Sequence, residues 1–459
     1  MRLEPGVTLS RLRRLPGVTG VEPDRVRNRS GRGDPFLPQQ TYLRQIAWTP
    51  PTGLRRPLVA VLDTGVDGRS RDLRGQIVPD LARSFIDGSS ALTDRSGHGT
   101  HVAGIIAAGA GNGLGVAGVA NARLLIVKVA DAQGRATTST LVRGIRYAVA
   151  HGARIVNLSF GGSGYSKLEQ DAIGDALHAG ALVVAAAGNS GGIGSPREYP
   201  GAYRHVLTVA ATRADGDAII ESTRGPQVAI AAPGKRVLST LPNGRYGRRT
   251  GTSMAAAVVS GAAARLLAAR PGLDPSQLRA LLIDSARDVA SPGRDDSTGW
   301  GVLDLRAALS ASTPRRDGSE PNDDPFQARR WPELDPGAAT GEVTAEATVE
   351  QWADPKDDYR VQLGVGDTVE IEARSLADQD LDLVIWRPDA PAFVPGSDYA
   401  RRWLAAAALG PGTSETLRYT ATESGVYTVE VQGPEGRGRY RITVRRTAAP
   451  PEPPPPPVP

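Results

Sequence analysis

The chain contains no cysteine, and this absence excludes several kinds of chemistry. Without a single cysteine among 459 residues, disulfides, thiol catalysis and thiolate metal sites are all ruled out. Cysteine-free composition suits an exported bacterial protein and a cytosolic protein equally well. The redox compartment therefore has to be inferred from other features.

An excess of charge of one sign is also missing. The 54 Lys and Arg residues nearly balance the 49 Asp and Glu residues, and the net charge of +5 is small for this length. Both signs are interspersed along the chain, which argues against a dedicated nucleic-acid surface. No apolar run approaches the ~18 residues that a membrane-spanning helix needs. We therefore expect neither a nucleic-acid partner nor a membrane span.

The stretch Gly251-Thr252-Ser253-Met254-Ala255-Ala256 begins a long segment of small residues. Residues 254–270 read as a buried helix that stops at Pro271. A serine at such a helix N-terminus has its hydroxyl beside unpaired N–H groups and the positive end of the helix dipole. This position favours an acyl-transfer nucleophile, although the motif on its own would be better explained as an ordinary N-cap.

Two further segments point to the same chemistry. Residues 59–67 are an apolar run that contains the carboxylate of Asp63, as in a buried parallel strand whose carboxyl end faces a site. His98 stands between Gly97 and Gly99, where a helix is expected to begin. An alcohol is a poor nucleophile at neutral pH, so Ser253 needs a base such as His98, and a carboxylate would orient that base.

The order Asp, His, Ser and the residues around each position resemble the subtilisin-like serine peptidases, from about residue 40 to residue 309. The resemblance implies a catalytic triad of Asp63, His98 and Ser253. It also implies an oxyanion-hole donor in Asn189, which follows the apolar run 181–187. The alternatives are a catalytically inactive relative for the triad and a turn asparagine for Asn189.

The same resemblance implies the substrate contacts. Ser159, Phe160 and Gly161 match the segment that pairs with an extended substrate, which would bind by strand addition. The primary pocket would have walls at Gly161 and at Ala186 to Gly188, with Glu198 at its base. A carboxylate there would attract Lys or Arg side chains, whereas the alternative is a solvated loop glutamate.

Calcium is the ion that the resemblance implies, and no organic cofactor is expected. Asp72 and Asn112 align with calcium ligands of the family, and oxygen ligands of this kind suit Ca²⁺. The alternative is that Gly111-Asn112-Gly113 simply forms a turn.

Alternating strands and helices predict a parallel sheet with helices on both faces, in a domain spanning residues 40–311. The strands are expected at 58–62, 124–129, 155–160, 181–187, 206–211 and 228–231. The helices are expected at 42–48, 98–108, 137–150, 167–179, 254–270, 275–286 and 304–309.

Beyond a linker at 312–319 the pattern changes. Residues 320–446 contain short segments that alternate with period two, which predicts a small all-β sandwich. This segment resembles the pre-peptidase C-terminal domain of secreted bacterial peptidases. The tail at 447–459 is rich in proline and should be extended.

Residues 1–28 look like a remnant of the inhibitory pro-domain of the family, and residues 29–39 would be a linker or maturation region. No apolar centre of a signal peptide is found, so we expect that a signal peptide and part of the pro-domain are missing from this chain. The whole sequence predicts a monomeric serine endopeptidase, made as a zymogen, secreted or bound to a bacterial cell wall, that hydrolyses proteins or peptides. The alternatives are a dedicated processing peptidase with a preference for basic P1 residues, and a non-catalytic binding or adhesion protein.

Overall fold

The computed structural model describes residues 16–18, 33–53, 55–314, 340–350, 356–388, 390, 402–434 and 437–449. The predicted pro-domain remnant falls outside the described residues apart from 16–18. The maturation region up to residue 32, the linker beyond residue 314 and the proline-rich tail from residue 450 also fall outside them.

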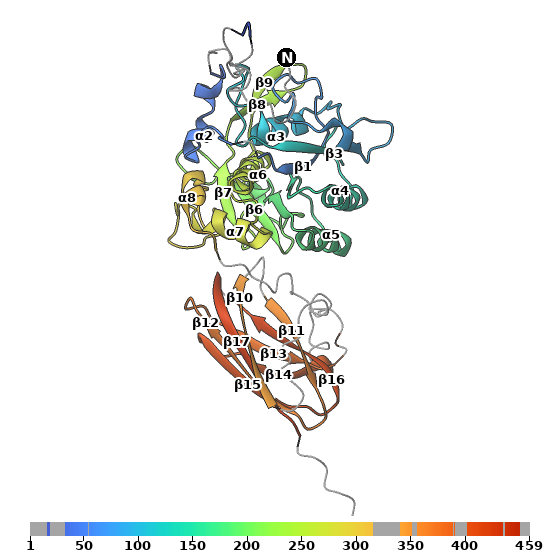
Figure 1. The fold of residues 1–459 in the computed structure, drawn as a ribbon, viewed down its shortest axis with the longest axis vertical. Coiled ribbons are helices and arrows are strands. Elements are labelled where there is room, and N and C mark those ends of the chain that lie inside the picture. The colour runs from blue at the N-terminus through green and yellow to red at the C-terminus, as the bar shows by residue number, and fades with distance from the viewer. Residues whose placement is uncertain are drawn as a thin grey trace, which may run out of the picture.

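A seven-stranded parallel sheet forms the centre of the larger domain (Figure 1). Its strand order is β2-β3-β1-β4-β5-β6-β7, and every pairing in it is parallel. The predicted parallel sheet is thereby confirmed. Its strands are β1 Leu58–Asp63, β2 Arg83–Ser84, β3 Arg123–Lys128, β4 Ile155–Leu158, β5 Leu182–Ala186, β6 Val206–Thr212 and β7 Ile230–Pro233.

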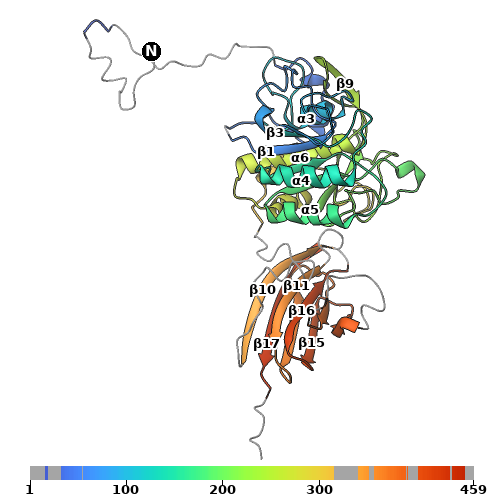
Figure 2. The same cartoon turned by 90° about the vertical axis from the view of Figure 1, so that its right-hand side faces the viewer.

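Helices cover both faces of this sheet, as expected. Helices α4 and α5 lie next to each other on one face (Figure 2), while α3, α6, α7 and α8 pack on the other. Along β1, Val59 and Val61 join the core beside α3 and α6, whereas Ala60 and Leu62 join the core beside α4 and α5. Because both faces are buried, the strands read as continuous apolar runs. The helices are α2 Thr41–Gln45, α3 His98–Ala107, α4 Thr138–Ala150, α5 Lys167–His178, α6 Thr252–Ala269, α7 Pro275–Asp284 and α8 Leu305–Ser310, with short 3₁₀ turns at Leu37–Gln39, Pro79–Leu81 and Gly191–Ile193.

Helix α6 corrects the sequence analysis in two respects. Its 18 residues have a mean hydropathy of 1.4, so by length and composition it does meet the test for a membrane-crossing helix. However, 83% of this segment is buried inside the protein, against the sheet, α3, α7 and α8, and it is therefore a core helix. The helix also begins at Thr252 rather than at Met254, so Ser253 lies within its first turn.

A hairpin that the sequence analysis missed packs against α3. Its strands are β8 Val237–Leu241 and β9 Arg245–Arg249, which pair antiparallel. The hydroxyls of Ser239 and Thr240 donate to backbone carbonyls of α3, each at 2.8 Å. Three of the five residues in β9 are arginines, so this strand carries no apolar alternation that would have marked it.

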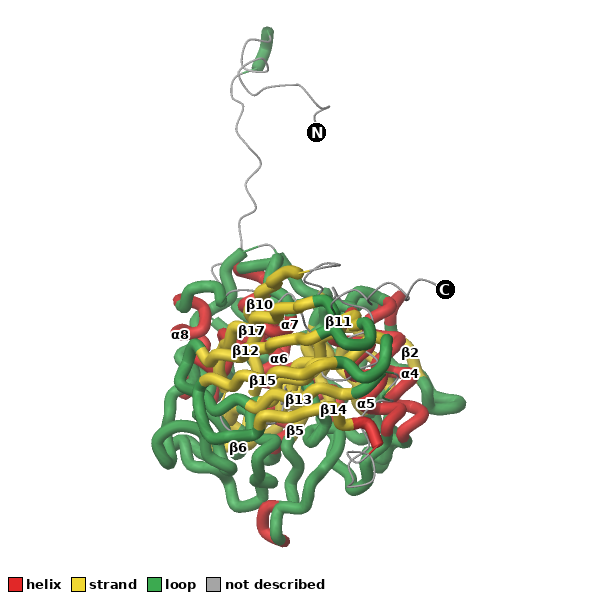
Figure 3. Tube along the Cα trace, turned by 90° about the horizontal axis from the view of Figure 1, so that it is seen from below, coloured by secondary structure: helices red, strands yellow, loops and turns green. Residues whose placement is uncertain are grey.

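The C-terminal domain consists of two four-stranded antiparallel sheets (Figure 3). Their orders are β10-β17-β12-β15 and β11-β16-β13-β14, and apolar residues of both sheets form one core. The predicted all-β domain is thereby confirmed. Its strands are β10 Thr340–Glu350, β11 Lys356–Leu363, β12 Thr368–Ser375, β13 Asp382–Trp386, β14 Leu404–Ala408, β15 Ser414–Thr420, β16 Gly425–Gln432 and β17 Arg437–Thr447.

Candidate active site

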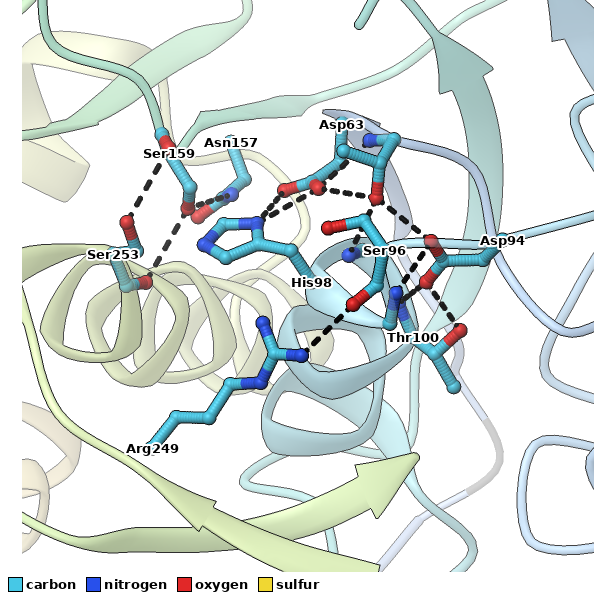
Figure 4. Close-up of polar contacts among 12 residues, drawn as sticks. Asp63, Asp94, Ser96, His98, Thr100, Asn157, Ser159, Arg249 and Ser253 are labelled. Atoms are coloured by element: carbon cyan, nitrogen blue, oxygen red, sulfur yellow. Dashed lines mark hydrogen bonds and ion pairs between the residues drawn. The ribbon is translucent and has the colours of Figure 1, made fainter. Parts of the chain in front are cut away.

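The carboxyl ends of three neighbouring strands bring the predicted site residues together. Asp63 is the last residue of β1, Ser159 follows β4, and Asn189 lies just beyond β5. These strands are adjacent and parallel in the order β1-β4-β5, so their carboxyl ends meet at one edge of the sheet. The N-termini of α3 and α6 deliver His98 and Ser253 to the same edge (Figure 4).

Asp63 is buried, with 1% of its surface exposed, and it holds His98 with both carboxylate oxygens. The distances from His98 Nδ1 are 2.8 Å to Oδ1 and 3.0 Å to Oδ2. Gly99 makes this approach possible, because a Cβ atom there would lie 2.0 Å from the carbonyl oxygen of Gly65. The backbone N–H of Thr64 also donates to Asp63 Oδ1, at 2.7 Å.

The surroundings of His98 raise its pKa overall. Burial by itself lowers the pKa, but the charge of Asp63 and its hydrogen bond more than offset that effect. The positive charge of Arg249 acts in the lowering direction. Because the side chain of His98 remains 23% exposed, it can reach a substrate while staying anchored to the protein.

The second histidine of this helix has a different role. His101 is fully buried, and its Nε2 lies 3.1 Å from the carbonyl oxygen of Gly247 in β9. Burial lowers the pKa of His101 to about 3, so the imidazole stays neutral at physiological pH. His101 therefore braces the hairpin against α3 and takes no part in proton transfer.

Ser253 lies on the opposite side of the His98 ring from Asp63 (Figure 4). Its hydroxyl donates to the carbonyl oxygen of Ser159 at 3.3 Å, and among the described residues no hydrogen bond joins it to His98. Rotation of the serine side chain would redirect the hydroxyl towards the imidazole, and catalytic hydrogen bonds are often loose before substrate binds. The structure thus brings the three predicted triad residues together, with the serine hydroxyl bonded to a backbone carbonyl.

Asp94 is a positioning residue that the sequence analysis missed. Its carboxylate accepts hydrogen bonds from the hydroxyl of Thr64 at 2.9 Å and from the backbone N–H of Gly97 at 2.8 Å. It also accepts from both the backbone N–H and the hydroxyl of Thr100, at 2.8 and 2.6 Å. Asp94 thereby ties the first turn of α3 to the end of β1. The only local sequence signal was a carboxylate four residues before His98, close to a helix start.

A second missed residue links α6, the helix that carries Ser253, to the sheet. Asn157 in β4 is completely buried, and its amide nitrogen donates to Ser159 Oγ at 2.9 Å. Its amide oxygen accepts from the hydroxyl of Ser260 in α6, also at 2.9 Å. These bonds hold the loop after β4 in place beside α6.

Asn189 is bonded to the first turn of α6 through the oxygen of its amide. Its Oδ1 accepts the backbone N–H of Thr252 at 3.0 Å and the hydroxyl of Thr252 at 3.1 Å. A backbone N–H can bond only to the amide oxygen, so these contacts identify the remaining end of the side chain as the NH₂ group. The side chain is exposed, and its NH₂ group can therefore meet a bound oxyanion.

Glu198, the predicted base of the pocket, lies beside Gly161 and Gly188, two of its predicted wall residues. A Cβ atom on Gly161 would lie 2.3 Å from Glu198 Oε2, and one on Gly188 would lie 2.2 Å from Oε1, so two glycines make room for the carboxylate. Thr223 donates its hydroxyl to Oε1 at 2.8 Å. Paired backbone bonds between Gly162 and Tyr199, at 3.0 and 2.8 Å, hold the two loops together.

Two other residues of the predicted substrate site, one from the pocket wall and one from the strand-pairing segment, pack against the protein core. Ala186 is 2% exposed and packs in the core beside α6, so its side chain does not face a substrate. Phe160 is half-buried and packs against the core on the other face of the sheet. Their predicted contacts with substrate stay predictions.

Asp72 and Asn112, the predicted calcium ligands, contact each other. Asn112 Nδ2 donates to Asp72 Oδ1 at 2.9 Å, and the backbone N–H of Val116 donates to Asp72 Oδ2 at 2.9 Å. The nearby Asp34 accepts the N–H groups of Gly111 and Gly113. The oxygens are of the type that calcium prefers, but these carboxylates already accept N–H groups. No cluster of three or more His, Asp or Glu residues suited to a metal occurs in the described part of the chain. The calcium site stays a prediction.

Comparison with known proteins identifies relatives of the larger domain. The profile of the subtilase family matches residues 55–301. The chain is 39% identical over 253 residues to subtilisin DY of Bacillus licheniformis, covering 54% of this chain and 89% of that protein. It is 39% identical over 237 residues to thermitase of Thermoactinomyces vulgaris, covering 51% of this chain and 82% of that protein. It is 35% identical over 283 residues to the cell wall-associated protease of Bacillus subtilis, covering 56% of this chain and 31% of that much longer protein.

Proposed function

The chain belongs to the subtilase family, and from that premise we propose that it is a serine endopeptidase that hydrolyses peptide bonds through an acyl-enzyme on Ser253. The observation that carries the proposal is the hydrogen-bonded pair of Asp63 and His98 beside Ser253, at the same edge of the sheet where Asn189 lies just beyond β5. A protein that used this fold only for binding would have no need of all four groups together.

The first half of the reaction follows from the positions of these groups. His98 Nε2 takes the proton of the Ser253 hydroxyl while Oγ attacks the scissile carbonyl carbon. The negative charge that develops on the carbonyl oxygen is met by the Asn189 NH₂ group and by N–H groups in the first turn of α6. His98 then returns the proton to the leaving nitrogen as the C–N bond breaks, and the acyl group remains on Ser253.

The second half of the reaction repeats these steps with water in place of Ser253. His98 takes a proton from a water molecule, whose oxygen attacks the acyl carbon. Collapse of the second tetrahedral intermediate releases the carboxylic acid product, and the proton returns to Ser253. Asp63 stabilises the imidazolium in both halves of the reaction. It also keeps neutral His98 in the tautomer that carries its proton on Nδ1.

This proposal is tested with the full chain and its Ser253→Ala variant. We expect the parent to cleave a casein or peptide-library substrate and to react with a fluorophosphonate probe, and the variant to do neither. Circular dichroism spectra of both proteins establish that they are folded. A folded parent that neither turns over substrate nor labels would reject the endopeptidase proposal in favour of a binding protein.

We further propose that Glu198 gives the enzyme a preference for Lys or Arg before the scissile bond. Its carboxylate lies between Gly161 and Gly188, within the loops that would flank the substrate side chain, and the hydroxyl that donates to it, from Thr223, is neutral. A half-buried carboxylate with a neutral partner attracts a cation.

The P1 proposal is tested with peptides that differ only at the residue before the cleaved bond. In the parent, kcat/KM should be higher for Arg and Lys than for Leu, and Glu198→Gln should remove this difference. Glu372→Gln serves as the matched control, because Glu372 is a half-buried carboxylate on β12 of the other domain. An unaltered P1 profile in Glu198→Gln would reject the assignment.

We also propose that the protein acts outside the cell as a monomer, either secreted or at the cell wall, on protein or peptide substrates. The relative from Bacillus subtilis named for the cell wall supports this location. Fractionation of the native host with an antibody against the larger domain, together with gel filtration, tests both statements.

A further inference from the structure

Arg249, the last residue of β9, lies beside the catalytic histidine. Figure 4 shows its guanidinium extending towards the imidazole of His98, on a different side of that ring from Ser159. Its Nη2 donates to the carbonyl oxygen of Ser96 at 2.9 Å, just before α3 begins. Arg249 is the second residue before Gly251, and it therefore lies on the chain that leads directly into the nucleophile.

The hydrogen bond to Ser96 uses only part of the donor capacity of the Arg249 guanidinium. The guanidinium carries five N–H groups, and the bond to Ser96 occupies one of them. Among the described residues, no carboxylate forms an ion pair with Arg249. The neighbouring Arg248 differs, because it is exposed and points to the other face of β9, where it donates to Gln39 Oε1 at 3.3 Å.

A cation at this position works against the proton transfer that His98 has to perform. Its charge opposes formation of the imidazolium on which the proposed reaction depends. A neutral donor could hold the carbonyl of Ser96 without opposing the imidazolium. The positive charge of Arg249 therefore needs a second role that compensates for its effect on His98. A carboxylate brought in by the substrate would neutralise the charge at the moment of catalysis.

The direction of the substrate indicates which part of it meets Arg249. The acyl part of the substrate would lie along Ser159 and Gly161, towards the pocket with Glu198. The leaving nitrogen receives its proton from His98, so the residues after the scissile bond leave the site past the imidazole. Arg249 is on that side of the histidine, away from Ser159.

We infer that Arg249 binds a substrate carboxylate on the leaving-group side, and that the enzyme favours Asp or Glu at the first or second position after the scissile bond. This inference rests on the proposed peptidase function. Arginine suits the task, because its planar fork binds a carboxylate with two parallel hydrogen bonds. Together with Glu198, it would make the site complementary to a basic residue before the bond and an acidic residue after it.

The test uses the full chain and quenched fluorescent peptides with amidated C-termini. The peptides carry Glu, Gln or Lys at the first or the second position after the bond. We expect kcat/KM to be about tenfold higher for Glu than for Gln at one of these positions, with Lys the poorest, and the difference to shrink in high salt. Arg249→Met should bring the Glu-to-Gln ratio to about one, whereas Arg249→Lys should retain part of it.

Arg248→Met is the matched control, because it removes a neighbouring positive charge from the other face of the same strand. It should keep both the activity and the Glu preference. A separate set of peptides ends directly after the second position, with either a free or an amidated C-terminus. A preference for the free acid over the amide would show that Arg249 binds the C-terminal carboxylate of the peptide. No Glu preference in the parent, or its persistence in Arg249→Met, would overturn the inference.

Two further measurements distinguish carboxylate binding by Arg249 from a purely structural role of its side chain. If Arg249 only braced the loop at Ser96, Arg249→Met would weaken all peptides equally and lower the melting temperature, and the inference would fail. Binding of the Glu and Gln peptides to Ser253→Ala, measured by fluorescence anisotropy, does not depend on turnover. Tighter binding of the Glu peptide that disappears in Ser253→Ala/Arg249→Met supports the inference even if the peptidase proposal fails, and equal binding overturns it.

Discussion

The carboxylate of Asp63 holds Nδ1 of His98 with both oxygens, at 2.8 and 3.0 Å. A carboxylate can only accept hydrogen bonds, so this contact places the proton of a neutral imidazole on Nδ1 and leaves Nε2 as the acceptor. In the proposed reaction, Nε2 is the nitrogen that takes the proton of Ser253. The side chain of Asp63 therefore determines which tautomer of His98 would enter that reaction.

Replacing Asp63 with Asn should lower kcat by about 10⁴-fold, because the amide favours the wrong tautomer of His98 while the fold is retained. Steady-state kinetics on a peptide substrate measure the effect. Asp175→Asn is a matched control, because it removes a surface carboxylate that pairs with Arg146 on the far helices. A loss below tenfold in Asp63→Asn would contradict the role assigned to this contact.

The pH dependence of kcat/KM should reflect the raised pKa of His98. Activity requires neutral His98, so the acidic limb of the profile should lie above the ordinary histidine pKa of about 6.5. Arg249 lowers this pKa, so Arg249→Met should move the limb to still higher pH, whereas Asp63→Asn should move it to lower pH. A limb that stays fixed in both variants would show that another group controls the profile.

Removing the NH₂ group of Asn189 should reduce kcat by about 10²–10³-fold with little change in KM, the usual loss for one oxyanion donor. Asn189→Asp is the sharper variant, because its carboxylate still accepts the bonds from Thr252 but donates none. Asn189→Asp should therefore lose at least as much activity as Asn189→Ala, because its negative charge also repels the oxyanion. Full activity in Asn189→Asp would exclude the side chain from the oxyanion hole.

Loss of the Asp94 carboxylate should both destabilise the domain and impair catalysis. Asp94→Ala leaves buried donors at Gly97 and Thr100 without their acceptor, which should cost about 2–4 kcal/mol. Chemical denaturation measures the loss of stability, and kcat measured well below the transition reports the displacement of His98. Asp304→Ala, which removes a half-exposed helix cap on α8, should cost only about 1 kcal/mol and leave kcat unchanged. A similar, small effect in both variants would refute the positioning role of Asp94.

Calcium should raise the melting temperature if it binds at the loop of Asp72 and Asn112. At 100 times its dissociation constant, a ligand adds about 2.7 kcal/mol of stability, which corresponds to a shift of several degrees in a domain of this size. Calorimetry with calcium and with chelator should show this shift in the parent, and Asp72→Asn should abolish it. An identical melting temperature with calcium and with chelator would mean that the hydrogen bonds from Asn112 and Val116 hold the loop without a metal.

The sequence by itself was sufficient for the elements with strong local signals. The continuous apolar strands and intervening helices predicted the parallel sheet, since strands buried on both faces need apolar side chains on both. The glycines around His98 and the small residues after Ser253 likewise marked two helix starts. Three motifs in order were sufficient to assign the family, because each depends on a short, contiguous stretch of chain.

Tertiary structure alone decided the contacts that join distant segments. Asp94 has only a weak local signal and Asn157 has none, because their partners lie in other elements and a single carboxylate or amide is common in loops and strands. Arg249 lies in a strand without apolar alternation, and it reaches His98 only because the β8–β9 hairpin folds over α3. The direction of the Asn189 amide likewise depended on its contact with Thr252, 63 residues away. Local periodicity reports which face of an element is buried, whereas the identity of the neighbour across that face depends on the packing of the whole domain.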